Sequence, residues 1–353
     1  MFLIQLRSPV LLTDYMNNKL TLADFDYQLP KELIAQESIK PRDQARLLVL
    51  DKKSGILEHF HFFDLPKILK ANSVLVFNNS KVIPARLHAS KLTGGQVEIF
   101  LLQQQQRQLW KCLIGGKIKR GDILKINNQI KAQALEQLAD HRQWLIKFNV
   151  ANKRLFSLGQ TPTPPYIKKP AKLKDYQTIF AKINGSVAAP TAGLHFTKRL
   201  LKQLMNQGIN IEFVTLHVGL GTFAPVTTEN ILEHQMHSEW ASINQETAKK
   251  LNQAKKQGKQ IIAVGTTAVR TLESFTDDYG KIKAQNDWVN LFIYPGYHFK
   301  FVDGLITNFH LPKSTLLMLV SALAGTENIK QAYKQAIKFH YRFFSFGDGM
   351  LIK

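Results

Sequence analysis

Short aliphatic runs and helix-like repeats alternate along much of this chain. Two runs near its start, 46–50 and 73–77, are β-branched or aliphatic and lie between turn residues, so they predict buried strands. In the second half, strands alternate with helical patterns, and we expect an α/β domain with a mostly parallel or mixed sheet. Its helices are expected at 197–207, 246–256 and 268–275, and its strands at 209–214 and 260–264.

The pattern changes between about residues 82 and 152, where short alternating segments are separated by turns such as Gly94-Gly95. Such spacing predicts a small all-β, barrel-like domain. A stiff, basic, proline-rich connector at 162–170 leads back to the α/β pattern. We therefore expect an inserted domain whose two ends lie close together. The expected boundaries are 1–20 for an N-terminal extension, 21–80 and 160–353 for the discontinuous α/β domain, and 81–159 for the insertion.

Composition limits the class and the compartment. Hydrophobic residues make up 44% and charged residues 21%, which is a globular balance. The single cysteine, Cys112, excludes a disulfide framework and a cysteine-based zinc site, and it fits a reducing compartment. No run of about 18 apolar residues predicts a membrane span, so we expect a cytoplasmic protein. Residues 1–15 are expected to be a dispensable extension or a misassigned start, because a more globular-looking segment begins at Met16.

The charge balance favours a polyanionic partner. Lysine and arginine number 47 against 26 acidic residues, which gives a formal net charge of +21 and a pI near 9.9. A surplus of this size favours binding to phosphates, because each neutralised phosphate releases counterions. A lysine bias across the whole lineage would produce the same surplus, and total charge leaves both explanations open.

A first candidate for ligand binding is the turn Gly265-Thr266-Thr267, which follows the strand expected at 260–264. A strand end, a glycine turn and a helix start together form a crevice for the polar groups of a ligand. The alternative is an ordinary helix start with a threonine N-cap. Arg270 and Glu273 on the same helix could simply pair on its surface.

Two further segments contain the glycines and small residues that let backbone approach a ligand closely. In 215–225, Gly219 and Gly221 follow His217 at the end of a strand, and a β-bulge with a satisfied histidine is the alternative. The run 185–197 is too rich in small residues for a conventional core strand and suits a loop against a flat ligand such as adenine. Phosphate cradling is its competing use.

The remaining candidates combine histidines, basic residues and aromatic residues. His234 and His237 lie near Glu239 without the His-Glu-x-x-His spacing, so we expect an acid/base pair or a substrate hydrogen-bond set rather than a metal site. The segment 341–350 ends an amphipathic helix with a lysine stripe, which suits nucleic acid but is more often a solvated face. The residues expected to contact tRNA are Lys168, Lys169, Lys334, Lys338 and Arg342.

Together these segments resemble the S-adenosylmethionine:tRNA ribosyltransferase-isomerase family of queuosine biosynthesis, from about Leu22 to Lys353. The motifs that carry the resemblance are long and occur in the expected order. They are Asp24–Pro30 (DFDYQLP), Ala188–Thr197 (AAPTAGLHFT), His217–Phe223 (HVGLGTF) and Asn308–Leu316 (NFHLPKSTL).

Two motifs depart from the family pattern. In Asn78–Arg86 (NNSKVIPAR), Asn79 replaces an acid and Lys81 replaces an arginine, which is not a conservative exchange at a bidentate contact. In Gly347–Met350 (GDGM), a glycine replaces an alanine. The first departure leaves the role of its loop open.

The resemblance implies transfer and isomerisation of the ribosyl part of S-adenosylmethionine onto 7-aminomethyl-7-deazaguanine at the tRNA wobble position. Epoxyqueuosine-tRNA, adenine and methionine are the products. This chemistry needs a base that removes a proton next to the sulfonium, an acid that helps adenine leave, and exclusion of water. S-adenosylmethionine is a co-substrate, no other cofactor is implied, and we expect a monomer that acts on tRNAs with queuosine-family anticodons.

The matching positions supply the candidate site. Catalytic residues are expected at His195, His217, Glu239 and Asp348, because imidazoles and carboxylates can move protons and a carboxylate is a natural neighbour for a sulfonium. Substrate-binding residues are expected at Arg86, Pro190, Thr191, Gly193, Gly219, Gly221, Thr222, His237, Gly265, Thr266, Thr267, Arg270, Asn308, His310 and Ser314.

Two other classes of function stay open. One is a different S-adenosylmethionine-dependent enzyme that modifies RNA, such as a methyltransferase, which would not release free adenine. The other is a non-catalytic tRNA-binding protein, which would bind without turnover.

Overall fold

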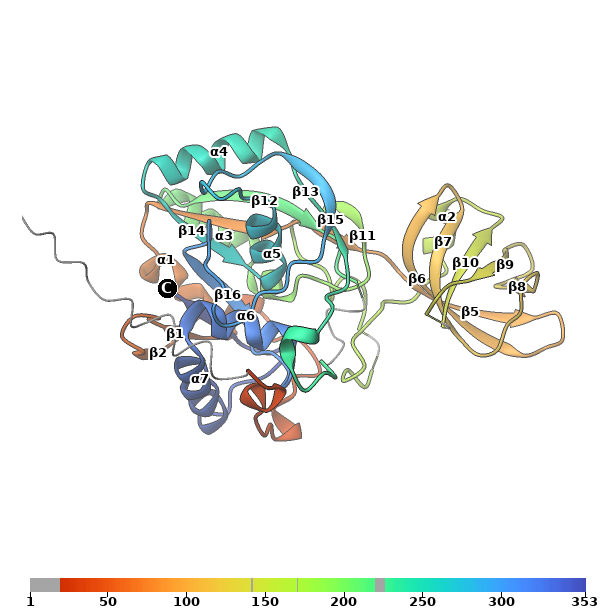
Figure 1. The fold of residues 1–353 in the computed structure, drawn as a ribbon, viewed down its shortest axis with the longest axis horizontal. Helices are drawn as coiled ribbons and strands as arrows, with labels where there is room; N and C mark the ends of the chain where they lie inside the picture. The colour runs from red at the N-terminus through yellow and green to blue at the C-terminus, as the bar shows by residue number, and fades with distance from the viewer. Residues whose placement is uncertain (1–19, 141, 170, 220–225) are drawn as a thin grey trace, which may run out of the picture.

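Two parts of different architecture lie at opposite ends of the long axis of the molecule (Figure 1). The computed structural model describes residues 20–140, 142–169, 171–219 and 226–353. Within these residues, one part holds a mixed nine-stranded sheet and the other is a closed six-stranded barrel. The expected fold class is therefore confirmed. The expectation for residues 1–15 lies outside the described residues.

The large sheet is parallel at its centre and mixes antiparallel pairs with one parallel pair, β17/β1, towards its edges. Its strands, in order, are β15 (Gln285–Val289), β13 (Glu239–Ile243), β12 (Asn210–Leu216), β3 (Ser73–Asn78), β14 (Gln260–Val264), β16 (Gly304–Asn308), β17 (Gly349–Ile352), β1 (Arg46–Leu50) and β2 (Leu57–His61). The run β12-β3-β14-β16 is parallel throughout. The pairs β15/β13, β13/β12, β16/β17 and β1/β2 are antiparallel, so the sheet is mixed rather than mostly parallel.

Helices cover both faces of this sheet. They are α1 (Leu65–Ile68), α3 (Lys198–Asn206), α4 (Gln245–Lys256), α5 (Thr266–Ser274), α6 (Thr315–Ala324) and α7 (Thr326–Lys338). In β3, Val74 and Val76 face the core that contains α4 to α7, and Leu75 and Phe77 face the core that contains α1 and α3. Because both faces are buried, the central strands are continuous aliphatic runs, as the sequence predicted.

The predicted helices of the second half are confirmed within a few residues, and their ends follow from local sequence. Asn244 precedes α4, and its side chain accepts a hydrogen bond from the N–H of Thr247 at 2.8 Å. The chain leaves this helix at Gly258, where φ is +69°. A capping asparagine at the start and a glycine in the left-handed region at the end are common at helix boundaries.

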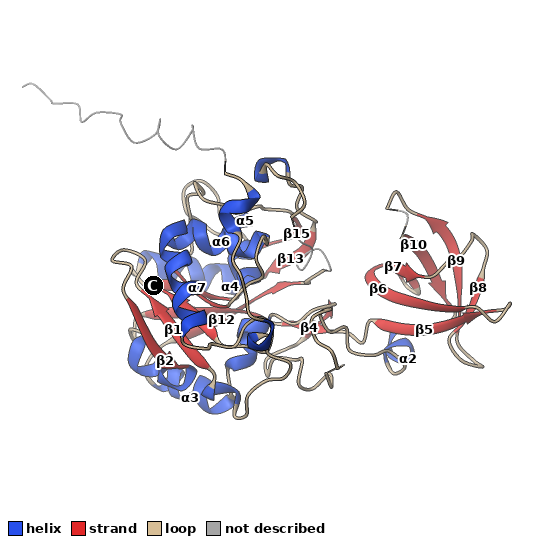
Figure 2. Cartoon of the chain, turned by 90° about the horizontal axis from the view of Figure 1, so that it is seen from below, coloured by secondary structure: helices blue, strands red, loops and turns tan. Residues whose placement is uncertain are grey.

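In the sequence, the barrel strands come between β4 (Ser80–Val82) and β11 (Ile183–Ser186). In space, these two short strands pair with each other in parallel. Figure 2 shows β4 between the sheet and the barrel. Arg86 and Gln160 exchange two backbone hydrogen bonds, at 3.3 and 2.8 Å, so the two chain segments that join the barrel run side by side as expected. The barrel strands are β5 (Arg86–Lys91), β6 (Gln96–Gln106), β7 (Leu109–Gly115), β8 (Ile123–Lys125), β9 (Lys131–Gln137) and β10 (Gln143–Phe148), and α2 (Asn152–Phe156) follows them.

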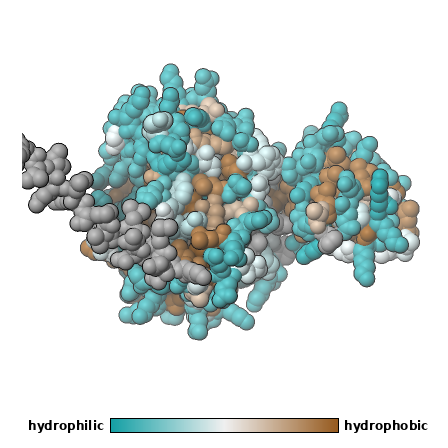
Figure 3. All heavy atoms as spheres, viewed as in Figure 1, coloured by the Kyte–Doolittle hydropathy of each residue, from teal (hydrophilic) through white to brown (hydrophobic). Residues whose placement is uncertain are grey.

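Alternate residues of the barrel strands fill its interior. Trp110, Cys112 and Ile114 of β7 and Trp144 of β10 are buried there. The face in Figure 3 is hydrophilic over most of both parts, with hydrophobic residues gathered near the middle of the α/β part and on the barrel. Across the part of the chain that the structure describes, no helix combines the length and the apolar character needed to cross a membrane.

Candidate active site at the strand ends

The carboxyl ends of the parallel strands meet at one edge of the sheet, and four predicted or neighbouring site residues lie there. Asn78 ends β3, His217 follows β12, Gly265 follows β14, and Asn308 ends β16. Open α/β sheets bind ligands at this edge, because the strand ends and the following loops leave a crevice. The topology thus brings together residues that are more than two hundred positions apart.

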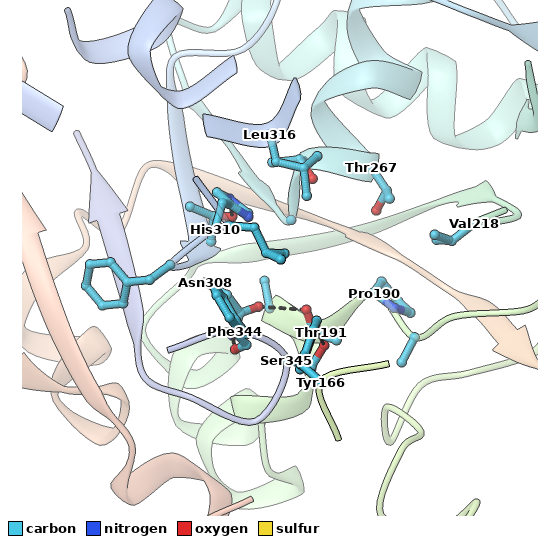
Figure 4. Close-up of a pocket in the computed structure, with 17 residues that line it drawn as sticks. Tyr166, Pro190, Thr191, Val218, Thr267, Asn308, His310, Leu316, Phe344 and Ser345 are labelled. Atoms are coloured by element: carbon cyan, nitrogen blue, oxygen red, sulfur yellow. Dashed lines mark hydrogen bonds between the residues drawn. The ribbon is translucent and has the colours of Figure 1, made fainter. Parts of the chain in front are cut away.

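A cavity of about 50 Å³ lies at this edge, and we call it the strand-end cavity (Figure 4). Its lining comes from the loop at 189–192, the start of α5, the end of β16, Leu316 and the C-terminal segment. The polar members are Tyr166, Thr191, Thr266, Thr267, Thr307, Asn308, His310 and Ser345, and the others are Ala189, Pro190, Ala192, Val218, Gly265, Phe309, Leu311, Leu316 and Phe344. These described residues include no carboxylate, lysine or arginine. The lining therefore suits an uncharged group that forms neutral hydrogen bonds.

Asn308 links the cavity to His195 behind it. The Thr191 hydroxyl donates to Asn308 Oδ1 at 2.8 Å, as the dashed line in Figure 4 shows, and Asn308 Nδ2 lies 3.2 Å from His195 Nε2. Because the amide nitrogen can only donate, Nε2 accepts and the proton of the neutral ring is on Nδ1. His195 itself does not line the strand-end cavity.

His195 is neutral at ordinary pH. Burial, together with the nearby cations of Arg42 and Arg342, lowers its pKa to about 3. The ring stacks on Phe62 at 4.1 Å between centroids, with an interplanar angle of 20°. The predicted catalytic histidine therefore forms a fixed, uncharged support for Asn308.

His310 is the predicted histidine that does line the strand-end cavity. Its Nε2 lies 2.9 Å from the Thr307 hydroxyl, and its backbone N–H donates to the Tyr333 hydroxyl at 2.8 Å. Burial lowers the pKa of His310 to about 3, so this ring is also neutral. It offers a hydrogen-bonding edge rather than a charge.

The helix α5 begins at the cavity through a glycine. Gly265 has φ of +93° and precedes the first turn, so the alternative of a threonine N-cap is wrong. Thr267 Oγ1 accepts a hydrogen bond from Asn78 Nδ2 at 3.1 Å, which joins the end of β3 to α5. Thr266 and Thr267 line the cavity and begin the first turn of α5. The backbone N–H groups of a first helical turn favour hydrogen-bond acceptors.

Arg270 and Glu239 form a buried ion pair beside this turn. Their side chains are each 4% exposed, and Arg270 also donates to the carbonyl of Leu291 at 3.2 Å. Glu239 Oε1 accepts the N–H of Gly219 at 2.7 Å. The alternative of a surface pair between Arg270 and Glu273 is wrong, because the Glu273 carboxylate is buried and accepts backbone N–H groups of residues 300–302.

His217 lies on the other side of Val218, in a larger hollow between the α/β part and the barrel. We call this hollow the interdomain cleft; its volume is about 1040 Å³, and Val218 lines both it and the strand-end cavity. His217 Nδ1 lies 2.8 Å from the Ser80 hydroxyl, and its ring stacks on Trp240 at 4.9 Å. Burial lowers the pKa of His217 to about 4. Exposed His237 also lines the cleft.

The predicted catalytic Asp348 is buried, and its carboxylate is bound by protein groups. Its carboxylate accepts the N–H groups of Arg46 at 2.9 Å and Arg342 at 2.8 Å, and it lies 3.3 Å from Arg46 Nε. The side chain is 2% exposed and does not line the strand-end cavity. It ties the C-terminal segment, which includes Phe344 and Ser345 of the cavity lining, to the start of β1.

Three other predicted substrate-binding residues have structural partners. Ser314 caps α6, accepting from the N–H of Leu317 at 3.2 Å. Gly193 packs against Phe180, whose ring would come within 2.7 Å of a Cβ atom at that position. Arg86 pairs with Glu98 at 3.3 Å, at the junction with the barrel. Gly221 and Thr222 lie outside the described residues.

The predicted tRNA-binding residues form two groups. Lys334 and Lys338 are exposed on α7, and Lys168 and Lys169 are exposed on the connector. Arg342 is half-buried, with its side chain donating to the carbonyl of Glu37. Figure 1 shows α7 on the side of the α/β part away from the barrel. The described residues contain no group of three or more metal-ligating side chains.

Sequence reasoning missed Tyr166, Phe344 and Ser345 as cavity-lining residues. The Tyr166 hydroxyl is 2.7 Å from Ser345 Oγ, and burial raises the pKa of Tyr166 to about 12, so the phenol is protonated. Tyr166 lies in the basic connector at 162–170, whose prolines and lysines are typical of a linker. Phe344 has φ of +69°, a conformation that is uncommon for a phenylalanine and that the local sequence does not predict.

Fold and cavity together define a class: an α/β protein with a cavity at its strand ends and an inserted antiparallel barrel. The family model described as "Queuosine biosynthesis protein" matches residues 22–352. The chain belongs to this family.

Its relatives align along nearly the whole chain. The S-adenosylmethionine:tRNA ribosyltransferase-isomerase of Staphylococcus haemolyticus is 50% identical over 341 residues, covering 94% of this chain and 100% of that protein. The protein of the same name from Thermotoga petrophila is 49% identical over 337 residues, covering 94% and 99%. The crystal structure of S-adenosylmethionine tRNA ribosyltransferase from Thermotoga maritima matches with 39% identity and a TM-score of 0.55, covering 94% of this chain and 100% of that one.

Proposed function

We propose that this protein transfers and isomerises the ribosyl part of S-adenosylmethionine onto 7-aminomethyl-7-deazaguanine at the wobble position of tRNA. The products are epoxyqueuosine-tRNA, adenine and methionine. The observation that carries the proposal is the family match over residues 22–352, with relatives of that activity at 49–50% identity along 94% of the chain.

In this proposal the strand-end cavity receives the adenosine end of S-adenosylmethionine. Hydroxyl and amide groups from Thr191, Thr267 and Asn308 are available for hydrogen bonds, and Phe344 and Tyr166 offer aromatic contact. Ligand sites commonly combine an apolar lining with a few convergent polar groups. A volume of about 50 Å³ is small for a nucleoside, so binding must enlarge this cavity or extend past Val218 into the interdomain cleft.

His217 is our candidate for proton transfer. Among the three predicted histidines near the strand ends, it is the one that lines the interdomain cleft, which is large enough for the second substrate. With its pKa lowered to about 4, the ring is neutral and can accept a proton, and the Ser80 hydroxyl fixes its orientation. The sulfonium of S-adenosylmethionine acidifies the neighbouring C–H bond, which reduces the strength required of the base.

The other predicted catalytic residues act by positioning in this scheme. His195 supports Asn308, Glu239 holds the N–H of Gly219, and Asp348 holds the C-terminal segment against β1. Each is buried and engaged by protein groups, which suits a residue that fixes geometry. Pro190, Gly193, Gly265, Thr266 and His310 are kept as candidate substrate neighbours, with His237 at the cleft.

The remaining expectations stay proposals. We infer a cytoplasmic monomer that acts on tRNAs with queuosine-family anticodons, with an α/β catalytic domain at 21–80 and 160–353 and the barrel domain at 81–159. The backbone pair between Arg86 and Gln160 supports boundaries near these positions. Exposed lysines at 168, 169, 334 and 338 support a role in tRNA binding.

One assay tests the proposed function against its alternatives. Purified protein is incubated with tRNA that carries the aminomethyl-deazaguanine and with S-adenosylmethionine labelled in its ribose. We expect label in the tRNA, epoxyqueuosine on nucleoside analysis, and free adenine. Labelled S-adenosylhomocysteine without free adenine would indicate a methyltransferase. Binding without any product would indicate a tRNA-binding protein.

A further inference from the structure

The interdomain cleft carries an aromatic ledge at its α/β wall. Trp240 of β13 and Trp288 of β15 are register partners in neighbouring antiparallel strands, and both line the cleft. Trp288 is 46% exposed, whereas the barrel residues Trp110, which also lines the cleft, and Trp144 are only 3% and 6% exposed. An indole this exposed on an edge strand leaves a large apolar face open to whatever enters the cleft.

This ledge is continuous with the proposed proton-transfer residue. The imidazole of His217 stacks on Trp240 with an interplanar angle of 19°, and Trp288 lies directly across the strand pair from Trp240. A planar group that lies on Trp288 would therefore be close to a substrate base that is presented to His217.

Positive charge reaches the cleft from both walls. Lys81 lies on β4, Lys111 on β7, Arg142 next to the start of β10, and Lys153 on α2. Within the described residues, none of these four cations forms an ion pair. Asp140 and Glu239 are the two acidic residues among the described residues that line the cleft, and Glu239 pairs with Arg270. The cations are thus available for an anionic backbone.

Aromatic faces beside cations are the features that bind single-stranded nucleic acid. Splayed bases stack on aromatic side chains, and lysine or arginine contacts the phosphates. A paired stem cannot present a base face in this way, because its bases are stacked on each other. The cleft volume of about 1040 Å³ also exceeds the room that one nucleobase needs.

We propose that the interdomain cleft binds unstacked nucleotides of the anticodon loop, with a base next to the modified one stacked on Trp288 and the phosphates near Lys81 and the barrel cations. This inference rests on the proposed function and deepens it, because it assigns the RNA site to the cleft. Lys81 stands where the related family pattern has arginine, so the loop at 78–86 keeps its positive charge at the cleft.

The test compares two RNA probes on the full-length protein. One is a hairpin that reproduces a tRNA anticodon stem and loop, and the other is a fully paired duplex of the same stem. Trp288→Ala should weaken hairpin binding about tenfold and leave duplex binding unchanged, because stacking on one base is lost. Trp288→Phe should restore most of the affinity, since a phenyl ring still offers a stacking face.

Controls separate stacking from folding and from general surface effects. Tyr279 is 96% exposed and does not line the cleft, so Tyr279→Ala should leave hairpin binding unchanged. Trp288→Thr, whose branched side chain suits a strand, provides a second variant if the alanine variant has a lowered melting temperature. Unchanged hairpin affinity in a folded Trp288→Ala or Trp288→Thr variant would overturn the inference, as would equal loss for hairpin and duplex.

Failure of the inference and failure of the proposed function are distinguishable. If the wild-type protein forms epoxyqueuosine-tRNA and the Trp288 variants bind the hairpin as tightly as it does, only the ledge assignment fails. If the wild-type protein forms no product, the proposed function fails, and the stacking site must then be judged from hairpin and duplex affinities alone.

Discussion

Gly185 lies against the imidazole of His217 so closely that a Cβ atom at position 185 would come within 2.5 Å of Nε2. The glycine also has φ of +150°, a conformation that residues with side chains rarely adopt. The ring cannot move away freely, because Ser80 bonds its Nδ1 and Trp240 stacks on its face. His217 can therefore keep this position only if residue 185 has no side chain.

Gly185→Ala should lower turnover by about a hundredfold, because a shift of roughly 1 Å in a reacting group has an effect of that size. The measurement is single-turnover transfer of labelled ribose to tRNA. Gly94→Ala is a matched control, since Gly94 also has positive φ, at +90°, but a Cβ atom at position 94 would meet nothing within 4 Å. If both variants lose the same small amount of activity, backbone strain explains the effect and contact with His217 does not.

His217→Ala should leave the fold intact and lower turnover by about a hundredfold or more, the usual range for a lost acid/base or positioning group. Ser80→Ala should have a milder effect in the same direction, because the ring loses the partner of its Nδ1. Thermal melts accompany the kinetics. Full turnover in a stable His217→Ala variant would remove this residue from the active site.

Stability should fall as the pH is lowered, because three histidines, buried His195 and His310 and half-buried His217, are neutral in the folded protein. Burial lowers the pKa of His195 and His310 to about 3 and that of His217 to about 4, whereas the unfolded value is about 6.5. Between those values the unfolded chain binds more protons, so the free energy of unfolding decreases as pH falls below about 6.5. Each histidine contributes about 1.4 kcal/mol per pH unit in that window.

Urea unfolding between about pH 7 and about pH 5 measures this slope. His310→Gln should remove one histidine from it, so the variant should lose less stability than the wild type over the same interval. Equal slopes for the two proteins would mean that His310 is protonated or solvated in the folded state.

Asp348→Asn should reduce the free energy of unfolding by about 2 kcal/mol, the range expected for hydrogen bonds to a buried charged group. The carboxylate accepts two backbone N–H groups and pairs with Arg46, and an amide cannot replace all of these bonds. Asp278→Asn is the control, because Asp278 is 97% exposed and pairs with Lys300 on the surface. Weaker S-adenosylmethionine binding with unchanged stability would instead place the Asp348 carboxylate beside the ligand.

The elements of the fold could be predicted, because local patterns determine them. The runs 46–50 and 260–264 are aliphatic since both faces of those strands are buried, and β7 alternates since one face is inside the barrel. Partners far apart in the chain could not be predicted. Asp348 lies 302 positions from Arg46, and the choice of Glu239 rather than Glu273 as the partner of Arg270 depends on how β13 packs against α5.

Binding of tRNA should weaken steeply with salt, because cations on the surface replace counterions on phosphates. With several phosphate contacts, raising the salt from about 50 to about 200 mM should lower the affinity roughly a hundredfold or more. Lys334→Glu combined with Lys338→Glu should weaken tRNA binding and leave S-adenosylmethionine affinity nearly unchanged, since both lysines are exposed on α7.

The slope of log affinity against log salt concentration then compares the number of phosphate contacts made by α7 with the number made by the interdomain cleft. Each lost phosphate contact reduces this slope by roughly 0.9 for a duplex and roughly 0.7 for a single strand. Lys81→Ala should reduce the slope for the anticodon hairpin, because Lys81 lines the cleft. The α7 variant should reduce it for full-length tRNA, because α7 lies on the side of the α/β part away from the barrel (Figure 1). A salt-independent affinity for wild-type protein would mean that the charge of +21 serves something other than tRNA. Loss of S-adenosylmethionine binding in step with tRNA binding would instead indicate misfolding of the variant.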